Sequence, residues 1–324
     1  MVVRVGIVGT GYAAKVRARA FSEDRRSCVK AVAGRDFART RAFAETQGVQ
    51  ARADWQQLIA DPEIDLVVIA TVSSLHGDVA EAALHAGKPV VVEYPLSLDL
   101  AQAKRLVALS VEKGLLLHVE HIELLGGLHL AMRSHLTSIG DVHYLNYRTL
   151  NPQMPAPMKW TYQPELFGFP FCGALSRVHR LTHLFGKVSQ VDCCMQMVPH
   201  PDEPGYVKSL LSSGRLVFSC GLIAELTYGK GERLWIRRRE VEMQGSLGAL
   251  TFVGNEGTLT TAEGSRAIVV APRKGLFVQD TKRVLDYLTA GNPLYVSAAE
   301  SLYALTVGDA LKRASQRGQT ITLE

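Results

Sequence analysis

Six consecutive residues, GTGYAA, follow a short apolar run near the start of the chain. The first glycine, Gly9, permits a tight turn, and Gly11 lets the backbone come close to a pyrophosphate. Ala14 lets the next helix pack closely on the strand, and the start of that helix favours an anion. A glycine-rich turn without a ligand is the alternative, but the strand–turn–helix context favours a dinucleotide site. The residues of this predicted site are Gly9, Thr10, Gly11, Tyr12, Ala13 and Ala14.

The end of the second apolar run indicates which dinucleotide the site prefers. It reads Ala33, Gly34, Arg35, Asp36, so a glycine stands where an enzyme that uses NAD usually carries an acid for the ribose 2′-hydroxyl. A missing carboxylate and a neighbouring guanidinium suit a 2′-phosphate, and we therefore expect NADPH, with NADH as a weaker alternative. A second interpretation is that Asp36 is the ribose acid, displaced by a residue or two.

Further polar residues follow two more apolar runs, at the edge where open α/β sheets bind their ligands. His76 lies near this edge, and it either lines the nicotinamide or begins a helix in solvent. The other predicted cofactor contacts are Thr71, Val72, Ser73, Glu93 and Tyr94.

Three residues at strand ends carry groups that can take part in proton transfer. Tyr94 is a hydrogen-bond donor, although a phenol with a pKa of about 10 is a weak acid at neutral pH. In the run HVEHIELL, Glu120 or His121 could relay a proton directly or through water. The alternatives are a tyrosine that packs on the nicotinamide, a structural carboxylate and a buried imidazole.

Arg177 is the strongest candidate for a catalytic residue. The run GALSRVHRLTHLF has helical spacing, and Arg177 lies at the edge of its apolar stripe. An unpaired buried charge is costly, so a guanidinium in this position usually has a partner or a ligand. An arginine that extends from the helix edge to solvent, or that forms a structural ion pair, is the alternative. His179 and His183 fall on the polar side of this helix, and we expect them at the surface.

Other residues are candidates for the substrate side of the site. Asn151, Phe167 and Phe169 could line a pocket, although a hydrophobic core would use the two aromatic residues as well. In the basic run IRRREVEM, Arg237 and Arg239 share one face of an extended chain. That face could meet an anionic substrate, while a solvated face is the alternative.

The elements that must position these residues fall into two groups. Up to about residue 122, apolar runs of strand length alternate with amphipathic stretches, which predicts a parallel, doubly wound sheet. After a helix-like stretch, longer alternating runs joined by the turns SSGR and GNEG predict a mostly antiparallel sheet, followed by two helices. We therefore expect an α/β protein with an NADP(H)-binding Rossmann domain over 1–122, a substrate-binding α+β domain over 123–324, and a cleft between them.

Composition narrows the class of protein. The chain has 324 residues, of which 47% are hydrophobic and 21% charged, as in ordinary globular proteins. A net charge of +5 fits a small anionic ligand better than nucleic acid. No apolar stretch is long enough to span a membrane, and the first residues resemble a strand and not a signal peptide, so we expect a cytoplasmic protein.

The cysteines and histidines indicate neither disulfides nor a metal. Five cysteines without a CxxC pair favour a reducing compartment. Cys193 and Cys194 are neighbours in an apolar run, so one thiol should point into the core and the other outwards. The histidine pairs 118/121 and 179/183 lack an HExxH pattern or a cysteine partner, and we predict no metal site.

A family resemblance rests on longer blocks. The segment VVVEYPLSL, together with GTGYAA and TVSSLHGD, resembles the glucose–fructose oxidoreductase and inositol dehydrogenase superfamily. Those enzymes usually read Glu-Lys-Pro, and their lysine serves in acid–base chemistry at a carbinol, whereas this chain has Tyr94 there. Within the superfamily, three blocks spanning residues 87–186 are similar to the biliverdin reductases: GKPVVVEYPLSL, EKGLLLHVEHIELL and ELFGFPFCGALSRVHRLTHLFG.

The resemblance implies reduction of biliverdin to bilirubin with NADPH, by hydride transfer to the central methine carbon. It also implies a bilin site between the two sheets, in which Arg177 would bind a propionate or organise proton delivery. Another oxidoreductase acting on a sugar, polyol or imine, and a non-catalytic protein that binds bilin or a dinucleotide, are the alternatives. We expect a monomer more than a homodimer. The predicted catalytic residues are Arg177, Tyr94, Glu120 and His121, and the predicted substrate contacts are Arg177, Tyr94, His121, Asn151, Phe167, Phe169 and Arg237.

Overall fold

The computed structural model describes residues 2–323, which form two compact units. The first unit runs to Ile122 and also includes Gly275–Leu302, and the second comprises Glu123–Lys274 and the chain from Tyr303 onward. The domain expected over 123–324 is therefore interrupted, because a helical segment returns to the first unit. No helix in the described part of the chain is long and apolar enough to cross a bilayer.

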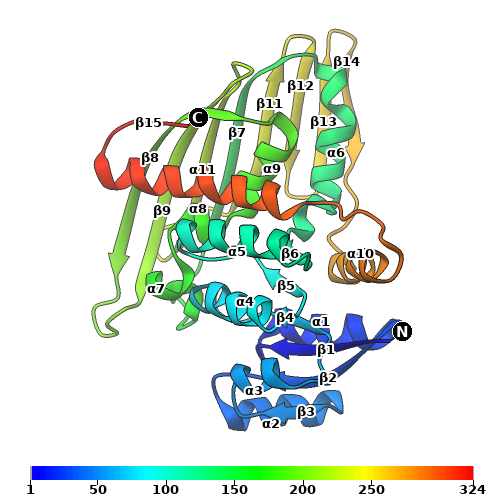
Figure 1. The fold of residues 1–324 in the computed structure, drawn as a ribbon. Coiled ribbons are helices and arrows are strands. Elements are labelled where there is room, and N and C mark those ends of the chain that lie inside the picture. Colours follow the sequence, from blue (N-terminus) through cyan, green and yellow to red (C-terminus); the bar gives the residue numbers. More distant parts are fainter. Residues whose placement is uncertain (1, 324) are drawn as a thin grey trace. The chain divides into compact units, whose positions relative to one another are not determined.

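The first unit is built on a six-stranded sheet with the strand order β3-β2-β1-β4-β5-β6, and all of its strands are parallel (Figure 1). Its strands are β1 (Val3–Val8), β2 (Ser27–Ala33), β3 (Gln50–Arg52), β4 (Leu66–Ile69), β5 (Val90–Glu93) and β6 (Leu117–Glu120). Its helices are α1 (Tyr12–Glu23), α2 (Phe37–Gln47), α3 (Trp55–Ala60), α4 (His76–His85), α5 (Leu100–Glu112) and α10 (Leu276–Ala290), with a short 3-10 helix η1 (Ser73–Leu75).

The apolar strand runs are buried because helices pack on the sheet. Ile7 on β1 and Val68 on β4 are at most 1% exposed, and they pack in one core cluster with Phe21 of α1. Val284 and Leu285 of α10 belong to the same cluster, which explains why this late segment folds with the first unit. Full burial of such a side chain stabilises the fold by about 1.5–3 kcal/mol.

The strand order places the predicted cofactor residues at one edge. It reverses direction between β1 and β4, and in such sheets ligands bind outside the carboxyl ends of the strands at this point. All six strands are parallel, so the residues that follow β1, β2, β4, β5 and β6 lie at the same edge. The predicted Rossmann domain is thereby confirmed.

The second unit carries a nine-stranded sheet with the order β14-β13-β12-β11-β7-β10-β9-β8-β15. Its strands pair antiparallel except for β7 with β10, which confirms the mostly antiparallel α+β domain. The strands are β7 (Val142–Pro152), β8 (Val188–Pro199), β9 (Val207–Phe218), β10 (Ile223–Gly231), β11 (Arg238–Gly245), β12 (Gly248–Val253), β13 (Glu256–Thr261), β14 (Gly264–Val269) and β15 (Ile321–Thr322).

Helical segments cover one face of this sheet. Figure 1 shows α9 and the later part of α11 lying against it. The helical segments are η2 (Ile122–Leu124), α6 (Gly127–His135), η3 (Leu136–Ile139), η4 (Trp160–Tyr162), α7 (Pro164–Phe167), α8 (Pro170–Gly173), α9 (Ser176–Phe185) and α11 (Ala298–Arg317), of which η2 and α11 begin within the first unit. The two predicted C-terminal helices correspond to α10 and α11 and are confirmed.

Two details of the predicted strands are wrong. The predicted turn SSGR lies inside β9, where Gly214 pairs with Cys193 and Leu226. A Cβ at Gly214 would come within 2.9 Å of Leu311, so this glycine marks a close approach of α11 and not a turn. β11 begins at Arg238, so Arg237 lies in the preceding loop and does not share a strand face with Arg239. Cys193 is buried and Cys194 exposed, as predicted.

Candidate active site

The glycine-rich turn after β1 has the shape that a pyrophosphate site requires. Gly9 adopts a φ of +134°, and a Cβ there would lie 2.2 Å from the carbonyl oxygen of Ala70 at the end of β4. No other residue type fits this position. A Cβ on Gly11 would stand in open space, directly before the first turn of α1. The turn therefore offers an accessible backbone and a helix N-terminus to an anion.

The end of β2 has no room for an acidic side chain at the expected position. A Cβ on Gly34 would lie 2.7 Å from Thr40 Oγ1 and 2.9 Å from Thr10 Cγ2. The alternative acid, Asp36, caps α2, because its side chain accepts a hydrogen bond of 3.0 Å from the backbone N–H of Arg39. Arg35 is exposed beside this edge. The arrangement is better suited to a 2′-phosphate than to a free 2′-hydroxyl.

His76 begins α4, as one of the two alternatives has it, but it is buried, so the solvent exposure in that alternative is wrong. Its Nδ1 lies 2.8 Å from the carbonyl oxygen of Pro95, and its Nε2 lies 3.3 Å from that of Thr71. Burial lowers the pKa of the imidazole, although the two carbonyl contacts oppose this shift. His76 thus ties the segment after β5 to the segment after β4. Ser73 is also buried, and its side chain is 2% exposed.

A buried ion pair supports Glu93, and the sequence analysis did not identify it. Arg17 on α1 is fully buried and donates from Nε to Glu93 Oε1 at 3.0 Å. Its Nη1 donates to Asp280 on α10. The signal in the sequence is a charged residue within the apolar face of α1, but its partner lies 263 positions away.

Asp280 is the centre of this network. It also lies 2.7 Å from His118 Nε2 and accepts a hydrogen bond of 2.7 Å from the Tyr295 hydroxyl. The Tyr295 oxygen in turn accepts a hydrogen bond of 3.1 Å from the backbone N–H of His121. Burial opposes ionisation of Asp280, but the charge of Arg17 and these hydrogen bonds hold its pKa below the ordinary value. The network thus fixes the chain around β6 from the side of α10.

Three predicted catalytic residues lie together at the ends of β5 and β6. The rings of Tyr94 and His121 are stacked, with centroids 5.3 Å apart and planes 5° from parallel. His121 Nε2 lies 2.8 Å from Ser301 Oγ. Glu120 is buried and accepts a hydrogen bond of 2.7 Å from the backbone N–H of Ile122. Burial, and then the nearby carboxylates, raise the pKa of Glu120 well above its ordinary value, which favours the neutral form of this side chain.

Arg177 lies on α9 in the second unit and faces strands β7 and β10. Its Nε donates to Thr149 Oγ1 at 3.2 Å, and its guanidinium carbon lies 4.6 Å from the ring centroid of Tyr228. Within residues 2–323 its two terminal nitrogens have no hydrogen-bond partner. A half-buried guanidinium with two available amino groups can bind a carboxylate in bidentate fashion.

Lys230 is a second cation near Arg177 that the sequence analysis missed. It is only 5% exposed, and its ammonium lies 3.8 Å from the ring centroid of Phe167. Asn151 is its register partner across the β7–β10 pair. The sequence feature that could have indicated this site is a lone lysine in the strand pattern TYGKG. A lysine in a strand usually extends to solvent, so the feature was not distinctive.

Other predicted residues lie elsewhere in the second unit. Phe169 precedes α8 and contacts Phe171, with ring centroids 6.1 Å apart, while Arg237 is exposed. The surface position expected for His179 is wrong, because it is 1% exposed. The side of α9 that the sequence suggested to be polar is covered by α6. The ring centroids of His129 on α6 and His183 on α9 lie 4.9 Å apart.

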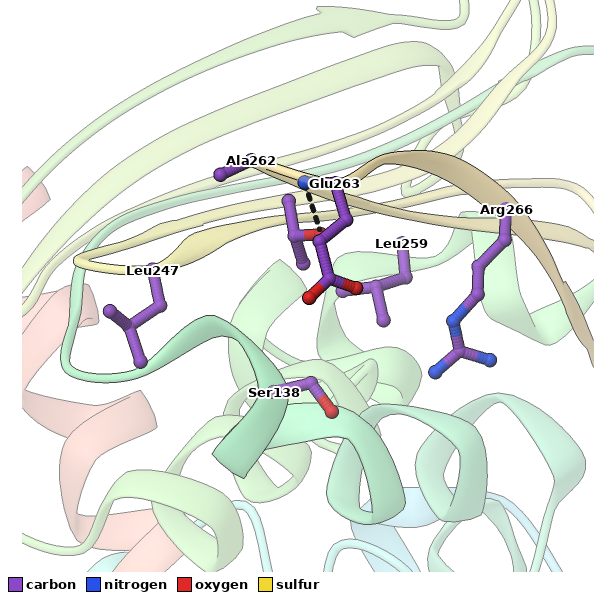
Figure 2. Close-up of a pocket in the computed structure, with 7 residues that line it drawn as sticks. Ser138, Leu247, Leu259, Ala262, Glu263 and Arg266 are labelled. Atoms are coloured by element: carbon purple, nitrogen blue, oxygen red, sulfur yellow. Dashed lines mark hydrogen bonds between the residues drawn. The ribbon is translucent and has the colours of Figure 1, made fainter.

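The second unit also has a hollow that contains none of the predicted site residues. It has a volume of about 400 Å³ and lies where η3 approaches the turns of the β12–β14 strands. Figure 2 shows Ser138 below the β13–β14 turn, with Leu259, Glu263 and Arg266 around it. The predicted substrate residues of the second unit therefore lie away from this hollow.

Comparisons with known proteins support an oxidoreductase. The model for an oxidoreductase family with an NAD-binding Rossmann fold matches residues 3–121, and the model for the C-terminal alpha/beta domain of the same family matches residues 135–323. Biliverdin reductase A of Mus musculus is 31% identical over 196 residues, which is 59% of this chain and 61% of that protein. The human protein matches to the same extent, so the chain aligns with about three fifths of the length of these relatives.

A solved structure matches nearly the whole chain. The crystal structure of biliverdin reductase from Synechocystis sp. PCC 6803, in complex with biliverdin and NADP+, has a TM-score of 0.95 and 52% identity, covering 97% of this chain and 99% of that one. An oxidoreductase from Agrobacterium radiobacter has a TM-score of 0.85 at 17% identity, with 99% of this chain and 98% of that one covered, which shows the fold alone. The chain belongs to the oxidoreductase family with an NAD-binding Rossmann fold and a C-terminal alpha/beta domain, and it is an NAD(P)H-dependent enzyme.

Proposed function

We propose that this protein reduces biliverdin to bilirubin with NADPH. The main support is the 52% identity over 97% of the chain to the Synechocystis reductase, which was crystallised with biliverdin and NADP+. The sequence of the site agrees with this proposal, because Tyr94 replaces the lysine that the sugar and polyol dehydrogenases of the superfamily use. That replacement makes a polyol dehydrogenase the less favoured alternative.

The first unit holds the cofactor in this proposal. The backbone at Gly9 and Gly11 and the N-terminus of α1 bind the pyrophosphate, and Arg35 meets the 2′-phosphate. When bound, NADPH supplies the hydride for the central methine carbon of the bilin. The Arg17–Glu93 hydrogen bond, at 3.0 Å, orients the Glu93 carboxylate and leaves its second oxygen for a cofactor hydroxyl.

The bilin is recognised by charge and by aromatic surface. Arg177 binds a propionate and stabilises negative charge that develops on the tetrapyrrole during reduction. Tyr94, held flat against His121, provides a surface on which a planar ring can stack. Glu120, whose pKa is raised by burial, relays a proton in this proposal, directly or through water.

We also propose that the protein acts as a monomer in the cytoplasm, without nucleic-acid or membrane partners. The face of the sheet opposite α9 and α11 carries polar contacts, such as those of Glu225 with Tyr144 and Asn146, at 3.0 and 3.1 Å. These polar side chains are well solvated without a partner. All five cysteines are free thiols, which suits a reducing compartment.

A visible spectrum tests the reaction. Mixing the protein with biliverdin and NADPH should replace the long-wavelength bilin band with a band in the blue, and NADH should act more slowly. Arg177→Ala should slow this conversion by about 100-fold or more, the range for loss of a group that stabilises transition-state charge. Arg215→Ala, which removes an exposed arginine paired with Asp192, is the matched control. A shifted but persistent biliverdin spectrum would instead indicate a binding protein.

A further inference from the structure

Lys230 is a buried cation to which the proposed function has so far given no part. Its ammonium lies 3.8 Å from the ring centroid of Phe167 and 4.8 Å from that of Tyr162. It donates a hydrogen bond to the carbonyl oxygen of Thr161. The carbonyl and the two ring faces keep the charged ammonium in one position. A lysine held this way is pre-organised and not free to move through solvent.

This lysine lies next to residues that the sequence independently predicts for the substrate. Asn151 is its register partner on β7, and Phe167 lies under its ammonium. Tyr228 is two residues earlier on β10, so its side chain points to the same face of the sheet. Arg177 packs on that tyrosine ring, at 4.6 Å from its centroid. Lys230 and Arg177 therefore serve the same part of the second unit.

Burial makes Lys230 a stronger acid than an ordinary lysine. Burial, and then the positive charge of Arg177, lower the pKa of Lys230 to about 7. The titratable groups packed around it are Arg177 on α9, Tyr162 on η4 and Tyr228 on β10. Neither cation forms a salt bridge within residues 2–323. An acid is most effective when its pKa is near the working pH, whereas a tyrosine at about 10 and an arginine above about 12 hold their protons too tightly.

We propose that Lys230 is the catalytic acid that protonates the bilin as it is reduced, an inference that rests on the proposed function. The hydride brings two electrons to the central methine carbon, and an electron pair passes to the imine-type nitrogen of an adjoining pyrrole ring. An N–H bond of the Lys230 ammonium breaks while an N–H bond forms on that nitrogen. The neutral amine then takes a proton from water, so one hydride and one proton are consumed for each bilirubin.

The first test replaces the lysine with methionine. Lys230→Met keeps an unbranched side chain only one atom shorter and suits the aromatic surroundings, so the variant should fold, which circular dichroism checks. We expect kcat to fall by about 100-fold or more, the usual contribution of a general acid, with a much smaller change in KM. In the wild type kcat should decline as pH rises through about 7, and the variant should lack this decline. Lys208→Met, a partly exposed lysine 3.8 Å from Glu232, is the matched control.

Two further measurements separate proton donation from charge alone. Lys230→Arg keeps the positive charge but has a pKa above about 12, so its kcat should stay as low as that of the methionine variant. In the complex of protein and biliverdin without cofactor, the long-wavelength band should change with pH near 7, and Lys230→Met should abolish this change.

Three results would overturn the inference. Retention of kcat and of its decline with pH in Lys230→Met would show that another group donates the proton. Recovery of kcat in Lys230→Arg would show that only the charge matters. A wild-type protein that binds biliverdin but never converts it would refute the proposed function itself, and the Lys230 role would fall with it.

Discussion

Removal of the Asp280 carboxylate should strongly destabilise the first unit. Its side chain is completely buried, and it is bonded to Arg17, His118 and Tyr295. Asp280→Ala leaves the fully buried Arg17 with Glu93 as its one acidic partner among the described residues. It also removes the carboxylate that His118 and the Tyr295 hydroxyl contact. Breaking a buried ion pair by removing one partner costs about 3–5 kcal/mol, and we expect a loss in this range.

A partly exposed ion pair of the same unit provides the control. Arg4 and Asp65 lie 2.7 Å apart, but their side chains are 36% and 27% exposed. Solvent screens such a pair, so Asp65→Ala should cost no more than about 1 kcal/mol. The double variant Arg17→Met/Asp280→Leu removes both fully buried charges and leaves only the Glu93 carboxylate, which is 17% exposed, without its partner. It should therefore be less destabilised than Asp280→Ala, which leaves the guanidinium in the interior.

Urea unfolding followed by circular dichroism gives the overall loss, and hydrogen exchange locates it. Peptides from β6 and α10 should exchange faster in Asp280→Ala, while those from β8 and β9 should be unchanged. Since the pKa of Asp280 is held below its ordinary value, its contribution is complete at pH 7 and begins to be lost only as the pH falls below about 4. A loss below about 1 kcal/mol, equal to that of Asp65→Ala, would refute this account of the network.

Two other predictions concern pH and the cofactor. Burial, with the nearby positive charges, lowers the pKa of His129 to about 3. Between about pH 6.5 and 3 the unfolded chain therefore binds a proton that the folded chain does not. As the pH falls through this range, the free energy of unfolding decreases by up to about 1.4 kcal/mol per pH unit. His129→Phe should flatten the pH dependence of the free energy of unfolding in acid, whereas the control His143→Phe, at an exposed histidine, should not. Equal pH slopes in the two variants would show that His129 is not the source of this dependence. Arg35→Ala should raise KM for NADPH by about tenfold or more, since a charge-assisted bond to phosphate is worth about 1.5–3 kcal/mol, and should leave KM for NADH nearly unchanged. Equal effects on both cofactors in steady-state assays would favour a general structural role for Arg35.

Local patterns were sufficient to predict the architecture, and with it the sheet edge at which the predicted cofactor residues lie. Strands buried on both faces produce continuous apolar runs, and the glycines of the first turn are required by its close approach to Ala70. Gly34 was equally informative, because a Cβ there would lie only 2.9 Å from Thr10 Cγ2 and 2.7 Å from Thr40 Oγ1. These constraints act between residues whose spacing is visible in the sequence.

What could not be predicted depends on distant partners. Arg17 meets Asp280 across 263 positions, and nothing in its own helix indicates a buried acid. The helix around Val284 packs on the first sheet, although the chain reaches it only after crossing the whole second unit. Lys230 resembled an ordinary strand lysine, and only the folded chain brings Phe167 and Tyr162 over its ammonium.

The most direct test of the proposed reaction follows the hydride itself. Biliverdin and the protein are mixed without oxygen, in a single turnover, with NADPH that carries deuterium at C4 of the nicotinamide, each C4 stereoisomer being tried in turn. We predict that one stereoisomer yields bilirubin one mass unit heavier, with the deuterium on the central bridge carbon. Bilirubin without deuterium from both stereoisomers, or no bilirubin at all, would contradict the account.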